Sequence, residues 1–155
     1  MHAAAVVTVS DGVSAGTRED TSGEAVVGML ADAGFEIRHR TVVPDDAGHI
    51  AMTVRGFVDE VDLIVTTGGT GFGPRDVTPE ATSQVIEREA PGMMTLMVME
   101  AKTPMAALSR GVVGSAGRTL IVNLPGSPKG ATENLAALLP IIPHALQLLG
   151  GDTEH

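Results

Sequence analysis

The chain has 155 residues, no cysteine and a formal net charge of −9 at pH 7. This length suits one domain with a single core, and the lack of cysteine excludes disulfides and thiolate chemistry. The acidic balance argues against nucleic-acid or anionic-membrane partners, because those surfaces attract basic proteins. No apolar run approaches the roughly 18 residues of a membrane span and the first residues lack a signal-peptide pattern, so we expect a cytoplasmic protein.

The first half of the chain alternates between apolar runs and amphipathic segments. Strands are expected at residues 3–8, a short apolar and partly β-branched run, and at residues 37–43, which Pro44-Asp45-Asp46 closes. The sequence Thr21-Ser22-Gly23-Glu24 matches a capping box, so a helix is expected to begin there and to end before Gly34. Apolar side chains at helical spacing predict another helix over residues 47–58.

The middle of the chain contains a continuous apolar run that ends in glycines. Residues 63–66 have the composition of a strand buried on both faces, and Thr67-Gly68-Gly69-Thr70-Gly71 follows at once. Thr78-Pro79-Glu80 combines a cap residue, an N1 proline and a first-turn acid. We therefore expect the glycine loop to end at a helix that runs to about Glu89.

The last third is expected to contain two helical regions and one more buried strand. Residues 92–100 are Met-rich and helical in pattern, whereas residues 102–117 suggest at most a short strand or hairpin near Val112-Val113. Residues 119–123 form a strand candidate, and the helix after them must be broken or kinked by its two prolines. This βαβα alternation predicts one α/β domain over residues 1–150, with a three-layer α/β/α arrangement, a mostly parallel sheet and a frayed tail at 151–155.

Four polar loops follow predicted strands, at Ser10 to Gly12, Pro44 to Asp46, Thr67 to Asp76 and Pro125 to Gly130. Ligands of open parallel sheets bind outside the carboxyl ends of the strands, so these loops are expected to meet in one pocket. Glycines let the backbone approach a ligand, and helix N-termini offer free N–H groups to phosphate. The pattern therefore indicates a phosphorylated ligand.

Several established site types are excluded. The glycine loop has neither the dinucleotide-binding nor the Walker spacing, and no G-x-S-x-G elbow is present. The five histidines are too scattered for a metal triad, and the methionines suit a core or a subunit contact. Asp45, Asp46 and Asp76 each follow a predicted strand. Spacing alone leaves metal binding and simple turn or cap roles equally open for them.

Three motifs together resemble one family. Residues 66–71 read TTGGTG, residues 75–81 read RDVTPEA and residues 124–130 read LPGSPKG. They are similar to the MogA/MoaB family of molybdenum cofactor biosynthesis proteins and to the gephyrin G domain, and Ser10-Asp11 adds to the resemblance. The likeness extends over nearly the whole chain.

The resemblance implies a usually trimeric α/β/α protein that transfers adenylyl from Mg-ATP to molybdopterin, releasing pyrophosphate. Carried over by position, the catalytic and Mg²⁺-binding aspartates are Asp45 and Asp76. Nucleotide contacts fall on Ser10, Asp11 and Gly12, where Gly12 replaces the arginine frequent in the family. Molybdopterin contacts fall on Thr67, Gly68, Gly69, Thr70, Gly71, Arg75, Gly126, Ser127, Pro128 and Lys129.

Other functions stay open at this point. A non-catalytic molybdopterin-binding or carrier protein of the same fold is the main alternative, and retention of Asp45 and Asp76 favours the enzyme. A molybdenum-inserting transferase, which would receive the product, carries further domains for which 155 residues leave no room. A scaffold built on this fold would bind neither molybdopterin nor ATP.

Overall fold

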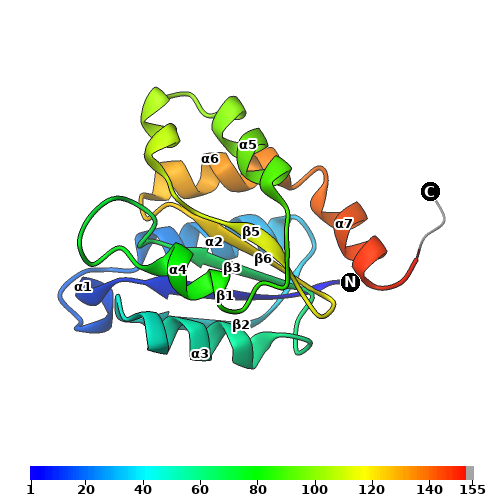
Figure 1. The fold of residues 1–155 in the computed structure, drawn as a ribbon, viewed down its shortest axis with the longest axis horizontal. Coiled ribbons are helices and arrows are strands. Elements are labelled where there is room, and N and C mark those ends of the chain that lie inside the picture. Colours follow the sequence, from blue (N-terminus) through cyan, green and yellow to red (C-terminus); the bar gives the residue numbers. More distant parts are fainter. Residues whose placement is uncertain (153–155) are drawn as a thin grey trace.

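The computed structural model describes residues 1–152 as three layers, with a sheet between two sets of helices (Figure 1). The strands are β1 (Ala3–Val9), β2 (Glu36–Val43), β3 (Leu63–Thr67), β4 (Arg88–Glu89), β5 (Val113–Ala116) and β6 (Thr119–Leu124). The helices are α1 (Asp11–Ser14), α2 (Thr21–Asp32), α3 (Ala47–Phe57), α4 (Thr78–Ser83), α5 (Pro91–Glu100), the 3₁₀ helix η1 (Pro104–Leu108), α6 (Pro128–Leu138) and α7 (Ile142–Leu149). Within residues 1–152, no helix is long and apolar enough to cross a membrane.

The sheet has the strand order β2-β1-β3-β6-β5-β4. The first four strands in this order run parallel, whereas β5 and β4 are antiparallel to their neighbours. The carboxyl ends of the parallel strands therefore meet at one edge, where α1 and the glycine loop lie at the left of Figure 1. The expected mostly parallel sheet is confirmed.

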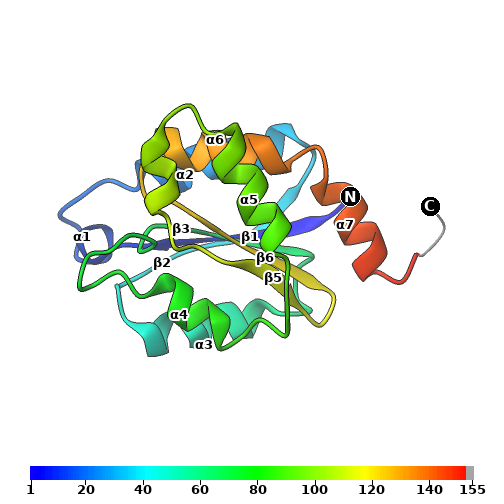
Figure 2. The ribbon, with the colours of Figure 1, turned by 45° about the horizontal axis from the view of Figure 1, so that its top comes forward.

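Small apolar side chains cover both faces of the sheet, because successive residues of a strand point to opposite sides. Along β1, Ala4 and Val6 pack toward α2 and α6, while Ala5 and Val7 pack toward α3. All four are fully buried. Figure 2 shows α2, α5 and α6 on one side of the sheet and α3 and α4 on the other.

Side-chain caps set the starts of α1, α2, α3 and α6. Asp20 accepts a hydrogen bond from the backbone N–H of Gly23 (3.0 Å), so it is Asp20, and not the expected Thr21, that caps α2. Ser10 caps α1 by accepting from Val13 N–H at 3.2 Å. The segment expected as a loop at residues 10–12 therefore includes the start of a one-turn helix.

The helix expected over residues 78–89 is wrong beyond its first turns, since α4 ends at Ser83. The chain then extends and pairs with β5, where Glu87 N–H donates to the Ser115 carbonyl (2.9 Å). Local helix signals cannot reveal this pairing, because the paired residues of the partner strand lie 25 and 27 positions further along the chain.

The weakly patterned stretch at 102–117 forms η1 and β5, which agrees with a short strand beside Val112-Val113. The expected proline break is also confirmed, because α6 ends at Leu138 and α7 begins at Ile142. The frayed tail expected at 151–155 falls mostly outside the described residues, which end at 152.

Candidate functional site

Two adjoining cavities lie at the carboxyl edge of the sheet, with volumes of about 410 and 460 Å³. Both are lined by Gly69, Asp76, Gly126 and Ser127. The glycine loop after β3 and the Pro-Gly-Ser-Pro loop after β6 therefore form the wall between them. The expectation that the strand-terminal loops meet agrees with this arrangement.

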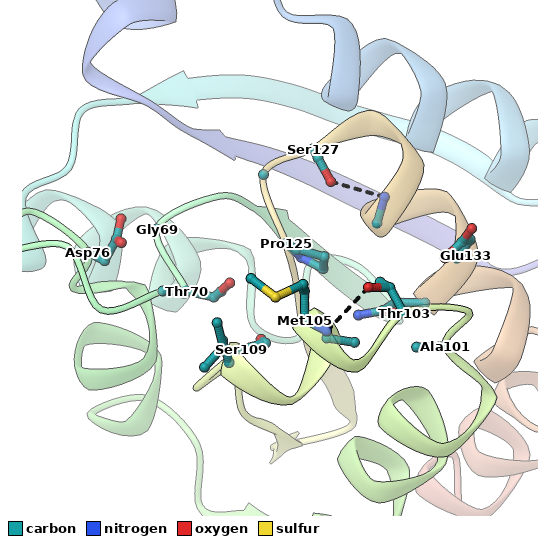
Figure 3. Close-up of a pocket in the computed structure, with 16 residues that line it drawn as sticks. Gly69, Thr70, Asp76, Ala101, Thr103, Met105, Ser109, Pro125, Ser127 and Glu133 are labelled. Carbon is teal, nitrogen blue, oxygen red and sulfur yellow. Dashed lines mark hydrogen bonds between the residues drawn. The ribbon is translucent and has the colours of Figure 1, made fainter.

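We call the first the η1 cavity, because the segment around η1 forms one of its walls. Figure 3 shows Met105, Thr70 and Pro125 around it, contributed by three separate segments of the chain. Its surface mixes apolar and polar groups, which suits a flat heterocycle with polar edges. Its lining residues are Gly69, Thr70, Gly71, Asp76, Ala101, Thr103, Met105, Ala106, Leu108, Ser109, Pro125, Gly126, Ser127, Gly130, Glu133 and Asn134.

We call the second the carboxylate cavity, because Asp45 and Asp76 both line it. Three acids and one base contribute to its surface, together with hydroxyl groups and glycine backbone. Its lining residues are Thr8, Val9, Ser10, Val13, Arg18, Glu19, Thr21, Ser22, Asp45, Thr67, Gly68, Gly69, Asp76, Gly126, Ser127 and Pro128.

The first two glycines of the loop after β3 adopt a backbone conformation that other residues rarely tolerate. Gly68 and Gly69 have φ values of +96° and +69°. A Cβ on Gly68 would collide with the Val9 carbonyl, and one on Gly69 would collide with Thr78 Oγ1. Thr78 holds this turn, since its Oγ1 donates to the Gly68 carbonyl (2.9 Å) and its N–H to the Gly69 carbonyl (3.1 Å).

Asp45 is positioned by the loop after β1. Its Oδ2 accepts from Asp11 N–H, its own N–H donates to Asp11 Oδ1, and both distances are 2.9 Å. Burial raises the pKa of Asp45, and the charges of Asp11 and Asp76 raise it further against the lowering effect of the Asp11 N–H. The cavity thus concentrates negative charge, which a bound cation would relieve.

Arg75 lies beside this pair but outside both linings. Its Nε and Nη2 donate to Asp11 at 3.0 and 3.1 Å, and this guanidinium lowers the pKa of Asp11. The predicted contacts Arg75, Asp11, Gly12 and Lys129 are absent from the residues that line the two cavities. The other predicted site residues line at least one cavity.

Arg110 holds the glycine loop in place, a role that the sequence did not predict. Its guanidinium donates to the Gly71 carbonyl (2.7 Å), the Asp76 carbonyl (2.8 Å) and Glu80 Oε2 (2.7 Å), while its N–H donates to the Thr70 carbonyl (2.8 Å). These bonds fix the backbone on both sides of residues 71–76. The Arg110 side chain is 29% exposed.

Asp46 has a structural role, because its side chain accepts from His49 N–H (2.8 Å) and caps α3. Of the two roles that spacing left open for the three aspartates, metal binding and a turn or cap, Asp46 therefore has the cap role. Asp76 instead accepts from Gly73 N–H (2.9 Å) and faces both cavities.

The carboxylate cavity suits a cation held jointly with phosphate. Within residues 1–152, no group of three or more His, Cys, Asp or Glu could hold a metal by itself. Mg²⁺ is commonly bound through one or two carboxylates plus substrate phosphates and water. Asp45 and Asp76 match that requirement, since they line one cavity and their charges interact.

The η1 wall was also missed, although a signal for it exists. Thr103 accepts from Met105 N–H (3.3 Å) and Pro104 occupies the first helical position. This Thr-Pro pair has the same form as Thr78-Pro79, which did predict a helix start. A weak apolar pattern after it concealed the short 3₁₀ helix.

The fold and the paired cavities define an open α/β domain that binds ligands at the carboxyl edge of its sheet. The model of the family described as "Probable molybdopterin binding domain" matches residues 5–144. The chain belongs to this family, which confirms the resemblance found in its motifs.

Individual relatives cover the chain almost completely. MoaB from Thermus thermophilus, a molybdopterin biosynthesis enzyme, superposes with a TM-score of 0.93 and 51% identity, over 97% of this chain and 98% of that one. A molybdopterin adenylyltransferase from Helicobacter pylori is 40% identical over 153 residues, which is 95% of this chain and 87% of that protein. The molybdenum cofactor synthesis protein cinnamon from Drosophila melanogaster is 41% identical over 96% of this chain, which spans only 26% of cinnamon.

Proposed function

We propose that this protein adenylylates molybdopterin, using Mg-ATP and releasing pyrophosphate. The observation that carries the proposal is that Asp45 and Asp76 line one cavity, and that Asp76 also lines the cavity beside it. Two substrates bound in adjoining cavities would meet at the shared wall. The similarity to adenylyltransferases that this chain covers over 87% of their length supports the assignment.

The two cavities suggest where each substrate binds. The η1 cavity, with its mixed surface around Met105 and Pro125, suits the pterin. The carboxylate cavity, which includes Ser10, suits the nucleotide. Gly69, Gly126 and Ser127 would then lie against the reacting phosphates, because they line both cavities.

In the proposed reaction, an oxygen of the molybdopterin phosphate attacks the α-phosphorus of ATP. The bond between the α-phosphorus and its bridging oxygen breaks, and pyrophosphate leaves with that oxygen and the electron pair. The protein would orient both phosphates through backbone N–H groups of the glycine loop. Asp45 and Asp76 would hold Mg²⁺, whose charge stabilises the phosphate oxygens.

The direct experiment incubates the purified protein with molybdopterin and Mg-ATP and measures pyrophosphate. We expect one pyrophosphate per adenylyl-molybdopterin formed, and none when molybdopterin is omitted. A protein that binds molybdopterin without releasing pyrophosphate would instead be the carrier considered above. A protein that binds neither substrate would be a scaffold.

We also propose a homotrimer, a cytoplasmic location and hand-over of the product to a molybdenum-inserting transferase. The resemblance of the motifs to the MogA/MoaB family supports these three points. Sedimentation equilibrium measures the first, and a mass of one or two chains would contradict it.

A further inference from the structure

Among the described residues that line the two cavities, one is basic: Arg18, in the carboxylate cavity. The acids around it outnumber it, since Glu19, Asp45 and Asp76 line the carboxylate cavity with it. An anionic ligand has one arginine to pair with directly in these cavities.

Arg18 is held over α1 by the absence of a side chain at Gly12. A Cβ at position 12 would lie 2.6 Å from Arg18 Cδ and 3.0 Å from Cγ, so the arginine stem occupies that space. The Gly12 carbonyl also accepts from Arg18 N–H (3.2 Å), Thr17 N–H (2.9 Å) and Thr17 Oγ1 (3.1 Å). Gly12 has no positive φ, so its small size serves this packing and not the backbone.

The guanidinium of Arg18 makes no hydrogen bond or ion pair with any residue between 1 and 152. Two other arginines close to the cavities, Arg75 and Arg110, already have partners in the protein. Arg75 is bound to Asp11, and Arg110 to Glu80 and two backbone carbonyls. Arg18 thus keeps its five donors for a ligand.

We propose that Arg18 binds phosphate oxygens of a nucleoside triphosphate in the carboxylate cavity, and that Gly12 exists to make room for it. The identity of the ligand rests on the proposed function. Arg18 brings its cation over the turn at residue 12 from six residues further along the chain.

The first test measures the Kd of Mg-ATP by calorimetry for the wild-type protein and for Arg18→Gln, without molybdopterin. We expect about 10-fold weaker binding, the lower range for one lost charge-assisted hydrogen bond, because Arg18 is exposed. Adenosine, which has no phosphate, should bind both proteins equally. Arg88→Gln removes the same charge at β4 and should leave the Kd unchanged.

The second test is a double-mutant cycle. Gly12→Ala should also weaken Mg-ATP binding, because the new methyl group displaces the Arg18 stem. If it acts only through Arg18, the double variant Gly12→Ala/Arg18→Gln binds no more weakly than Arg18→Gln alone. Fully additive losses would overturn the role given to Gly12.

Other results separate this inference from the proposed activity. An unchanged Kd in Arg18→Gln, an equal loss for adenosine, or no binding of Mg-ATP to the wild-type protein would overturn the phosphate contact. A loss confined to molybdopterin would overturn the nucleotide assignment. A wild-type protein that binds Mg-ATP through Arg18 but releases no pyrophosphate would overturn the activity and support the contact.

Discussion

The carboxylate of Asp45 carries a cost to stability, because burial and neighbouring acids raise its pKa above 3.8. A pKa raised by folding favours folding at low pH, and that contribution is lost as the pH rises through the folded pKa. At neutral pH, Asp45→Asn should therefore raise the Tm while it lowers adenylylation, and below pH 3.8 the difference in Tm should vanish. Thermal scans at about pH 3 and pH 7 check this, and a lower Tm at neutral pH would contradict the electrostatic account.

Asp76→Asn removes the negative charge of this side chain, at the wall between the two cavities, but keeps its shape. The amide oxygen of Asn can still accept from Gly73 N–H, so the loop should keep its conformation. We expect turnover to fall by about 10² or more, as for other lost charge-stabilising groups. Asp46→Asn is the matched control, because Asn also caps helices and Asp46 lines neither cavity. Equal turnover in Asp76→Asn and the wild-type protein would refute the metal-binding role.

Position 68 requires glycine for two reasons: its φ is positive, and a Cβ there would meet the Val9 carbonyl of β1. Gly68→Ala should cost about 2 kcal/mol or more in unfolding free energy, because strain and the collision with the Val9 carbonyl add together. Gly28 lies in the exposed interior of α2 with open space around it. Gly28→Ala should therefore stabilise the folded protein by about 0.5–1 kcal/mol. Urea denaturation compares the two, and a similar effect of both would contradict the geometry.

At the scale of elements, Arg110 connects the segment after η1 to the glycine loop. Lysine keeps the charge but cannot span the Gly71 carbonyl, the Asp76 carbonyl and Glu80 together. Arg110→Lys should cost about 1–2 kcal/mol in stability and speed hydrogen exchange of the amides between residues 71 and 78.

Turnover of Arg110→Lys should fall about 10-fold with a smaller change in KM, because misplacing Asp76 affects the transition state most. Arg55→Lys provides the control, since Arg55 makes one bond, to the Gln84 carbonyl, away from both cavities. Normal exchange in the loop of Arg110→Lys would show that the clasp does not position it.

At the scale of the whole molecule, the sheet is buried most deeply along β1, β3 and β6, whose residues are almost all inaccessible. Native-state hydrogen exchange should therefore give these three strands protection equal to the global unfolding free energy. The two-residue strand β4 and the exposed η1 should exchange far faster. Equal protection of β4 and β3 would indicate that the edge is covered by another chain.

Much of this fold could be predicted from local patterns. The strands predicted at 3–8, 37–43, 63–66 and 119–123 are the four parallel strands, with small changes at their ends. The central strands leave a strong local signal because they are buried on both faces and are mostly apolar, whereas the edge strand β2 is only partly buried. The convergence of the four loops followed from that order, since parallel strands end at a common edge.

The sequence by itself determined the layers and the edge of the sheet where the loops meet, because periodicity and caps act over a few neighbouring residues. The roles of Asp45 and Asp76 stay predictions from the family resemblance. Only the tertiary structure decided that residues 88–89 extend, that Arg75 pairs with Asp11 and that Arg110 clasps the glycine loop. It also decided that Arg18 covers Gly12. Each of these depends on which atoms meet after the chain has folded, and such contacts leave no periodic trace in the residues that make them.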